Sequence, residues 1–231
     1  MNPTDCYPGS ELGVLADAVN YPRWVVDEFR PYFGATVAEV GAGIGTISKL
    51  ILACGATRLL AFEPSTNLFQ KLVEEMAKEP RCVPINDLFR PARAAGCDSV
   101  AYVNVLEHIE DDAAELRLAY DSLRPGGHLL VFVPALSWLY SEFDRSIGHF
   151  RRYTKRGLRN VVAQAGFELV SVRYFDVAGI IPWYVNFVLL KNQPNHGSVR
   201  LYDRLVVPVM RWAESLVAPP LGKNLLLVAR K

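Results

Sequence analysis

The sequence has almost no net charge, few cysteines and no long apolar run. Its 25 Lys and Arg residues against 24 Asp and Glu give a formal net charge of +1, so only a local patch could favour nucleic acid or an anionic membrane. The four cysteines form no CxxC pair, which argues against a four-cysteine zinc site and favours free thiols in a reducing compartment.

Targeting and membrane-spanning signals are missing as well. The first twenty residues hold no basic apolar run, so no signal peptide is visible. The longest notable uncharged apolar stretches, residues 126–141 and 177–190, are shorter than the roughly 20 residues that a membrane span needs. We therefore expect a cytoplasmic protein with no transmembrane segment.

What the sequence does contain is an alternation of short β-rich runs and helical patterns. Apolar residues make up 51% of the chain, which is enough for a large core. The alternation indicates βαβ units and an α/β fold with a mostly parallel sheet. We expect strands at residues 36–40, 58–63, 81–85, 99–104, 128–133, 167–175 and 224–230. We expect helices at residues 21–30, 46–54, 66–78, 112–123 and 154–165.

Boundary signals divide the rest of the chain. Asn20 and Ser65 are expected to cap the helices that follow them, and residues 124–127 form a turn that ends the helix at 112–123. Residues 176–223 look helical in two pieces, divided near residues 191–198. We interpret residues 1–231 as one domain with residues 176–223 as a helical insertion.

A glycine turn with the order Gly-Ala-Gly-Ile-Gly, residues 41–45, follows the first strand and opens a helix at Thr46. Glycines allow a tight turn and a close approach of a ligand to the backbone, and the helix start offers free N–H groups to a negatively charged group. Glu63 ends the second strand, 22 residues after Gly41. A carboxylate at that place can accept hydrogen bonds from both hydroxyls of a ribose. The combination predicts a cofactor that contains ribose.

The residues around the turn favour one class of cofactor over another. A dinucleotide fingerprint has the spacing GxGxxG, but here Thr46 occupies the position of the third glycine. Glu39 would repel a pyrophosphate and can pair with an ammonium group. S-adenosylmethionine carries both an amino acid and an adenosine, so it fits better than a nicotinamide dinucleotide. A nicotinamide-dependent oxidoreductase stays open as an alternative.

Five segments in order resemble the class I S-adenosylmethionine-dependent methyltransferases. Residues 39–45 resemble their first motif, Glu63 their acidic residue on the second strand, and residues 84–88 their third-strand motif. Residues 104–112 resemble the branch that includes the ubiquinone and menaquinone methyltransferases, and residues 123–129 match the turn before the fifth strand. The resemblance covers roughly residues 20–175 and the last strand.

The resemblance implies a Rossmann-like sheet of seven strands in the order 3-2-1-4-5-7-6, with strand seven antiparallel. It implies S-adenosyl-L-methionine as the methyl donor and S-adenosyl-L-homocysteine as the product. The cofactor would lie across the carboxyl ends of strands one, two and four. The expected cofactor-binding residues are Tyr21, Glu39, Gly41, Ala42, Gly43, Gly45, Thr46, Glu63, Pro64, Asn86, Asp87, Leu88, Asn104 and Val105.

Methyl transfer from a sulfonium is an in-line displacement, which requires alignment and, in some reactions, removal of a proton. His108, His149 and Tyr153 are the candidates for catalytic roles, although His108 also suits a structural role. Some relatives bind a divalent metal through a carboxylate three residues before Glu-His. Asn104 occupies that position here and is a weaker ligand, so we expect no metal.

Two further segments are candidates for acceptor binding. Arg151 and Arg152 precede a helix and would favour an anionic acceptor. A solvated helix start explains the later basic residues of the run, Lys155, Arg156 and Arg159, but explains these two less well. Trp183 and Tyr184 lie in the uncharged stretch 177–190. That stretch fits packing over the sheet, a homodimer interface, an apolar acceptor pocket or a lipid surface.

The leading hypothesis is a methyltransferase (EC 2.1.1.-) that acts on an O, N or C atom of a small molecule. A nucleic-acid-binding methyltransferase-like protein is a further alternative, which the basic run at residues 145–159 keeps open. The Asp/Asn-Pro-Pro-aromatic motif of the enzymes that methylate nucleobase amino groups is absent, because Val105 and Leu106 follow Asn104. Nucleic acid is therefore not the expected partner.

Overall fold

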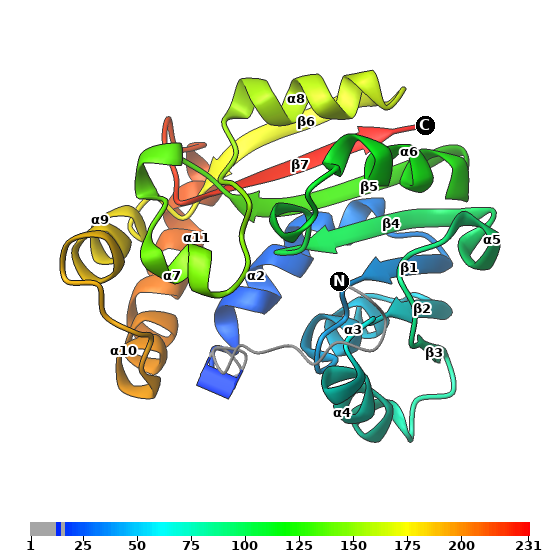
Figure 1. Ribbon diagram of the computed structural model, residues 1–231, viewed down its shortest axis with the longest axis horizontal. Helices are drawn as coiled ribbons and strands as arrows, with labels where there is room; N and C mark the ends of the chain where they lie inside the picture. Colours follow the sequence, from blue (N-terminus) through cyan, green and yellow to red (C-terminus); the bar gives the residue numbers. More distant parts are fainter. Residues whose placement is uncertain (1–12, 15–16) are drawn as a thin grey trace.

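A computed structural model describes residues 13–14 and 17–231 of the chain. Seven strands in this part form one sheet in the order β3-β2-β1-β4-β5-β7-β6 (Figure 1), as predicted. Only β7 runs antiparallel to its neighbours, β5 and β6. The strands are β1 (Thr36–Val40), β2 (Arg58–Phe62), β3 (Cys82–Ile85), β4 (Cys97–Val103), β5 (Leu123–Pro134), β6 (Glu168–Phe175) and β7 (Asn224–Arg230).

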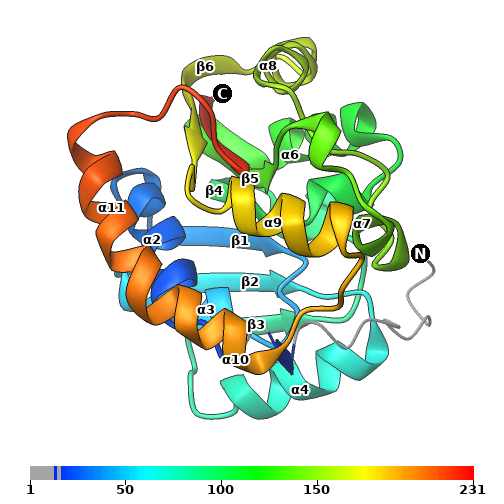
Figure 2. The ribbon, with the colours of Figure 1, turned by 90° about the vertical axis from the view of Figure 1, so that its left-hand side faces the viewer.

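Helices cover both faces of the sheet, so that β1 and β2 lie between two helical layers (Figure 2). One layer contains α2 (Asn20–Phe29), α3 (Thr46–Ala53), α4 (Thr66–Met76) and α11 (Val207–Leu216). The other contains α5 (Pro91–Ala94), α6 (Asp112–Ser122) and α8 (Lys155–Gln164). Short α7 (Glu142–Ser146) lies in the loop between β5 and α8.

The central strands are buried on both faces, as the uncharged fourth run predicts. In β4, Tyr102 belongs to the core under α6 and α8, whereas its neighbour Ala101 packs in the core under α2. Phe132 of β5 packs on the α2 side as well. This double burial fixes the sheet between the two helical layers. The ends of the strands are then the places where a ligand can reach the sheet.

The predicted turn at residues 124–127 is part of a strand instead. β5 begins at Leu123, which pairs with Cys97 of β4, and backbone bonds from the far end of the chain extend the pairing at residues 126–127. Gly126 N–H donates to Lys231 O at 3.0 Å, and Lys231 N–H donates to Gly127 O at 2.9 Å. The local pattern of turn residues does not reveal a partner that is more than a hundred residues away.

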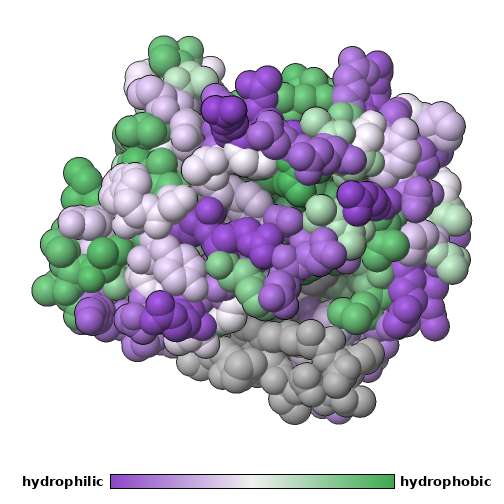
Figure 3. Space-filling view, turned by 45° about the horizontal axis from the view of Figure 1, so that its top comes forward, coloured by the Kyte–Doolittle hydropathy of each residue, from purple (hydrophilic) through white to green (hydrophobic). Residues whose placement is uncertain are grey.

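Residues 176–223 form two helical pieces between β6 and β7, as predicted. The first joins α9 (Ile180–Trp183) to a π-helical turn (Tyr184–Leu189). The second joins α10 (His196–Leu201), a π-helical turn (Tyr202–Val206) and α11. In Figure 3, hydrophobic residues gather at the left margin, the side on which Figure 1 draws α9 and α10. Among the described residues, no helix has both the length and the apolar character needed to cross a membrane.

The cysteines agree with the expectation of free thiols wherever they can be followed. Cys54, Cys82 and Cys97 are free. Cys6 lies outside the described residues, as do most of the residues on which the signal-peptide prediction rests.

A carboxylate from a distant segment caps the amino end of α2. Asn20 is not the N-cap: the helix begins at this residue, and Val19 at the cap position makes no side-chain bond. The carboxylate of Asp203 instead accepts hydrogen bonds from the N–H groups of Val19, Asn20 and Tyr21 at 2.8–3.0 Å, and from the Asn20 side chain at 3.1 Å. Ser65 does occupy the cap position of α4, but its side chain makes no capping bond. The contact from Asp203 ties the last helical segment to α2.

The cap predicts the effect of replacing Asp203. Asp203→Asn keeps the side-chain size but turns one acceptor into a donor that faces N–H groups. We expect the free energy of unfolding to fall by about 1–3 kcal/mol, measured by urea denaturation. Asp121→Asn, at an exposed position of α6, is the matched control and should stay within about 0.5 kcal/mol of the parent. Equal denaturation midpoints for Asp203→Asn and the parent would contradict the role of this cap.

Candidate active site

The glycine turn lies where β1 ends, next to the end of β4, at the point where the strand order reverses. Gly41, Gly43 and Gly45 all have positive φ, at 69°, 57° and 86°. A Cβ on Gly41 would lie 2.6 Å from a methyl of Val105, so the turn packs tightly on the segment after β4. A Cβ on Gly43 would meet nothing within 4 Å. The turn therefore has one packed side and one open side.

The helix after the turn offers its amino end to the same space. Gly45 is the cap residue of α3, in the left-handed conformation, and no side chain bonds to the first N–H groups. The turn itself is held in place, because Ala42 N–H donates to Phe62 O of β2 at 2.9 Å. A helix start whose N–H groups are uncapped, and whose preceding turn is held in place, is suited to bind a negatively charged group.

Glu63 closes the turn from the end of β2. Its two carboxylate oxygens accept from the N–H groups of Gly43 and Ser65, each at 2.8 Å. Burial raises the pKa of Glu63 above its usual value, and these two bonds oppose the shift. The Ser65 side chain bonds to the carboxylate as well, and the carboxylate keeps capacity for a further hydrogen bond, since each of its oxygens has two lone pairs. Asn86 joins the group, because its side chain donates to the carbonyl oxygens of Glu63 and Pro64 at 2.9 and 3.1 Å.

Glu39 is buried beneath the turn. It accepts a hydrogen bond from the Ser48 hydroxyl at 2.5 Å, and Ser48 itself is buried in α3. Burial, with a smaller contribution from the negative charge of Glu63, raises the pKa of Glu39 to about 8. Sequence reasoning missed Ser48, whose only signal is its place on the first turn of the helix.

The other predicted cofactor residues are spread around this centre. Asn104 is exposed, with a φ of 54° at the end of β4, and Leu88 is exposed as well. Asp87 accepts from Leu88 N–H at 2.8 Å and pairs with Arg90. Tyr21 packs against Trp24, Phe132 and Phe175, and its hydroxyl donates to Asn224 at 3.1 Å.

A second polar cluster forms around Asp144 in the loop after β5. This buried carboxylate accepts from the N–H and hydroxyl of Ser141, both at 2.8 Å, and from Arg152 at 2.8 and 3.0 Å. His149 Nδ1 lies 2.9 Å from the same carboxylate. Burial opposes ionisation of Asp144, but the bonds from His149 and Arg152 outweigh it and lower its pKa. The sequence signal for this residue is the Ser-x-x-Asp capping box of α7.

Glu107 and two histidines face one another beside this cluster. Both carboxylate oxygens of Glu107 are buried without a hydrogen-bond partner, and His149 Nε2 lies 3.8 Å from one of them. Burial raises the pKa of Glu107 to about 7 and lowers that of His108 to about 4. The ligand atoms of Glu107, His108 and His149 all lie within 4.8 Å of one another, a spacing that could hold a metal ion. The three residues therefore form either a proton-transfer group or a cation site.

The predicted acceptor residues have partners within the chain. Arg151 pairs with Asp112 at 2.8 Å, and Arg152 pairs with Asp144, so an acceptor anion would have to compete with these carboxylates. The Tyr153 hydroxyl donates to Asp112 at 2.7 Å, and both its burial and this bond raise its pKa. Among the residues predicted for the acceptor side, His149 differs because its Nε2 faces the carboxylate of Glu107, which has no hydrogen-bond partner among the described residues.

Trp183 brings the first helical piece onto this loop. Its indole N–H donates to Leu139 O at 3.1 Å, and the Arg152 guanidinium lies 4.4 Å from the centre of its ring. Tyr184 is exposed and its ring contacts Trp138 edge-on. Trp183 faces the candidate acceptor side, whereas Tyr184 faces outward.

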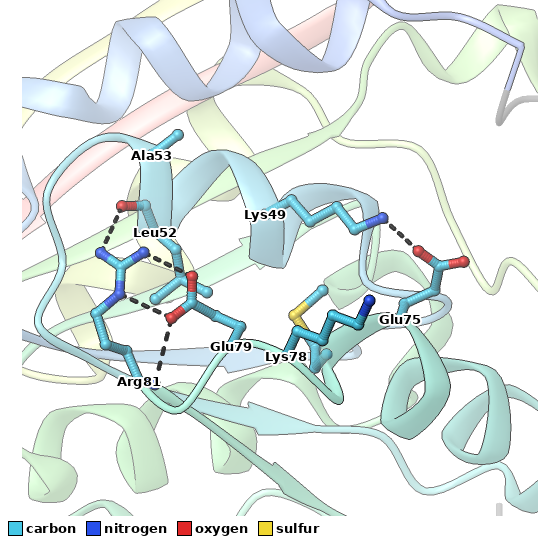
Figure 4. Close-up of a pocket in the computed structure, with 8 residues that line it drawn as sticks. Lys49, Leu52, Ala53, Glu75, Lys78, Glu79 and Arg81 are labelled. Atoms are coloured by element: carbon cyan, nitrogen blue, oxygen red, sulfur yellow. Dashed lines mark hydrogen bonds and ion pairs between the residues drawn. The ribbon is translucent and has the colours of Figure 1, made fainter.

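A groove of about 370 Å³ between α3 and α4 is not part of this site (Figure 4). It is lined by the end of α3 and by Arg81 before β3, at the amino edge of the sheet. Arg81 pairs with Glu79 at 2.6 Å and donates to Leu52 O at 3.1 Å, and Lys49 pairs with Glu75. Most of its charged groups are thus bound to one another, which leaves little for a ligand.

Comparison with known proteins decides the family. A family model described as a methyltransferase domain matches residues 25–172, more than half of the chain. The chain belongs to this methyltransferase family. The predicted resemblance is confirmed, and S-adenosylmethionine as the cofactor is confirmed with it. The match also decides against the nicotinamide-dependent alternative.

Individual relatives agree with this family. A curated ubiquinone biosynthesis O-methyltransferase from Methylobacterium is 31% identical over 126 residues, which are 51% of this chain and 47% of that protein. The chain thus aligns with about half the length of this relative. A methyltransferase from Mesorhizobium loti has a TM-score of 0.57 at 16% identity and covers 97% of this chain and 99% of its own.

A third similar structure is the Haemonchus contortus phosphoethanolamine N-methyltransferase 2, which was solved in complex with S-adenosyl-L-methionine. Its TM-score is 0.62 at 16% identity, with 92% of this chain and 52% of that chain covered. These similarities confirm the predicted class I methyltransferase fold.

The raised pKa of Glu39 predicts how stability changes with pH. The native protein holds a proton on this residue up to about pH 8, whereas the unfolded chain loses it near pH 4.5. Stability should therefore fall as the pH rises between these values, by up to about 1.4 kcal/mol per pH unit. Urea denaturation at pH 5.5, 7 and 8.5 should show this decrease of the unfolding free energy in the parent. Glu39→Gln should lack the part of the decrease that comes from Glu39. Glu75→Gln, at an exposed site, should keep the parent slope; equal slopes in all three proteins would refute the assignment.

Proposed function

We propose that this chain is an S-adenosylmethionine-dependent methyltransferase that acts on a small-molecule acceptor, with residues 1–231 as one domain. The observation that carries the proposal is the open side of Gly43, next to the buried carboxylate of Glu63 and the uncapped start of α3. S-adenosylmethionine supplies a methyl group that its positive sulfur already activates. The chain has to bind the donor, align the acceptor and exclude water.

The residues around the turn have separate roles in binding the donor. Glu63 accepts from the ribose hydroxyls, since its carboxylate keeps capacity for a hydrogen bond beyond those from Gly43 and Ser65. Glu39 pairs with the ammonium group, which would favour the charged form that burial disfavours. Asn86, Asp87 and Leu88 are expected at the adenine, and the exposed Asn104 amide at the end of β4 is available to the amino-acid part. Tyr21, in α2, supports this side of the sheet through its contacts with β5, β6 and β7.

On the acceptor side we assign His149 the role of a general base, oriented by Asp144. Asp144 holds Nδ1, which leaves Nε2, 3.8 Å from Glu107, as the ring nitrogen that takes a proton from an acceptor hydroxyl. A hydroxyl acceptor agrees with the name of the Methylobacterium relative, an O-methyltransferase. Arg152 and Tyr153 then position the loop through Asp144 and Asp112, and Trp183 covers the acceptor.

The donor site predicts the behaviour of a Glu63 variant. Glu63→Gln removes a charged acceptor for two hydroxyl groups and places an amide against N–H groups. We expect the affinity for S-adenosylhomocysteine to fall at least about tenfold, because a hydrogen bond to a charged group contributes about 1.5–3 kcal/mol. Isothermal titration calorimetry measures the change, and Glu75→Gln is the control that should bind like the parent. An unchanged dissociation constant for Glu63→Gln would sink the assignment of this residue.

The acceptor side predicts a change in rate without a change in donor binding. With an acceptor found from a panel of phenols, alcohols and amines, His149→Ala should lower single-turnover methyl transfer by about 10²–10⁴-fold. Donor affinity should stay constant, and His196→Ala, at an exposed histidine, should leave the rate unchanged. We expect dialysis against EDTA to leave the parent rate unchanged. Activity that is lost with EDTA and restored by one divalent ion would instead make Glu107, His108 and His149 a metal site.

A further inference from the structure

The last helical segment has an apolar face that no other part of the described chain covers. Leu201, Leu205, Val209, Trp212 and Leu216 follow one another at spacings of three and four residues, which places them on one side of a helix. All five side chains are exposed, between 57% and 67%. A soluble helix normally turns such a stripe inward.

The opposite side of the same segment anchors it to the protein. Asp203 caps α2, and Val207 belongs to the core that Trp24 and Phe132 share. Glu214 accepts from the N–H groups of Asp176 and Val177 at 3.2 and 3.0 Å, where β6 ends. The orientation of the helix is therefore fixed by buried contacts, and the apolar stripe faces outward as a result.

The first helical piece adds a second apolar stripe on the same side of the molecule. Ile181, Val185 and Leu189 are spaced four residues apart and are all exposed. Trp183 and Phe187 on its inner side pack against Phe143. Figure 2 looks onto this side and shows α9, α10 and α11 together at the surface. We call the two stripes, residues 181, 185 and 189 with residues 201, 205, 209, 212 and 216, the apolar face.

Within the segment that carries the apolar face, the exposed charges have one sign. Between residues 177 and 223 the only acids are Asp203 and Glu214, and both are buried. The exposed Lys and Arg residues of this segment are Lys191, Arg200, Arg204 and Arg211.

Acids outside the segment pair with only some of these cations. Arg200 and Arg211 pair with Asp17 and Asp27 at 2.9 and 2.8 Å. Lys191 and Arg204 have no acidic partner in the described part of the chain. The rim of the apolar face therefore carries positive charge.

We propose that the apolar face docks on a membrane surface that contains anionic lipids. Apolar side chains with a Trp among them, on short helices with cations at the edge, match the pattern of segments that lie in the interfacial region of a bilayer. Anionic headgroups neutralise the cationic rim. A second copy of this chain would bring the same positive rim against itself, so a self-association through this face is disfavoured. The proposal does not depend on which molecule is methylated.

Vesicle binding of the full chain tests the proposal. Flotation with vesicles of phosphatidylcholine and phosphatidylglycerol at 7:3 should carry the protein with the lipid, and pure phosphatidylcholine should carry much less. The binding should weaken as the salt concentration rises. Trp212 emission should shift to shorter wavelength with the anionic vesicles, and this shift should be lost in Trp212→Phe.

Two pairs of variants separate the apolar and the electrostatic contributions. Leu205→Glu should weaken partition onto the anionic vesicles more than tenfold, because it removes an apolar side chain that the bilayer would bury, whereas Val73→Glu on the exposed side of α4 should have no effect beyond that of its charge. Arg204→Glu should weaken partition about twenty- to thirtyfold, the effect of two charges near an anionic surface. Arg156→Glu, which makes the same change on α8, should cost less. Cofactor affinity and circular dichroism should be the same for all four variants.

Three results would overturn the proposal. One is the absence of binding to either kind of vesicle. A second is that the protein binds both kinds of vesicle equally and that Arg204→Glu does not change this binding. The third is a dimer in sedimentation velocity at micromolar concentration that Leu205→Glu dissociates, because it would show that a second copy covers the apolar face.

Discussion

Buried carboxylates that accept hydrogen bonds from backbone N–H groups hold the loops of this protein in place. Glu63 joins the glycine turn to the end of β2, Asp144 closes the loop after β5, and Asp203 fixes the start of α2. A buried charge is costly unless several donors satisfy it, and here each carboxylate accepts from more than one donor. The positions of the glycine turn, of His149 and of the last helical segment all follow from these three contacts.

Two other buried acids are not satisfied in the same way. Glu39 has one hydroxyl donor, and Glu107 has no hydrogen-bond partner among the described residues. Both have pKa values raised into the neutral range by burial. Unsatisfied polar groups in a native structure mark places where a ligand or a reaction supplies what the chain does not. In this protein, Glu39 lies beneath the proposed donor site and Glu107 lies on the proposed acceptor side.

The glycine turn and the positions of the strands could be predicted because their signals are local, whereas the order of the strands was implied only by the resemblance to the class I methyltransferases. The first strand occupies residues 36–40, as predicted, since alternation and the following glycines are visible within a few residues. The cap of α2 and the partners of Arg151 and Arg152 could not be predicted in this way. Asp203 lies more than 180 residues from the N–H groups that it accepts from, and no sequence spacing relates the two. A solvated helix start accounts for Lys155, Arg156 and Arg159, whereas Arg152 is buried and its charge is paired with Asp144, a partner that the basic run does not reveal.

The π-helical turn at Tyr202–Val206 has a consequence for how the last segment could have evolved. A π-turn amounts to one residue inserted in an α-helix, and one residue corresponds to about 100° of rotation. Such an insertion turns everything that follows it about the helix axis, while everything before it stays in place. A gain or loss of one codon at this turn would rotate α11 by about 100° relative to the residues before the turn. Such a change would alter which side chains of α11 meet the core and which meet the surroundings.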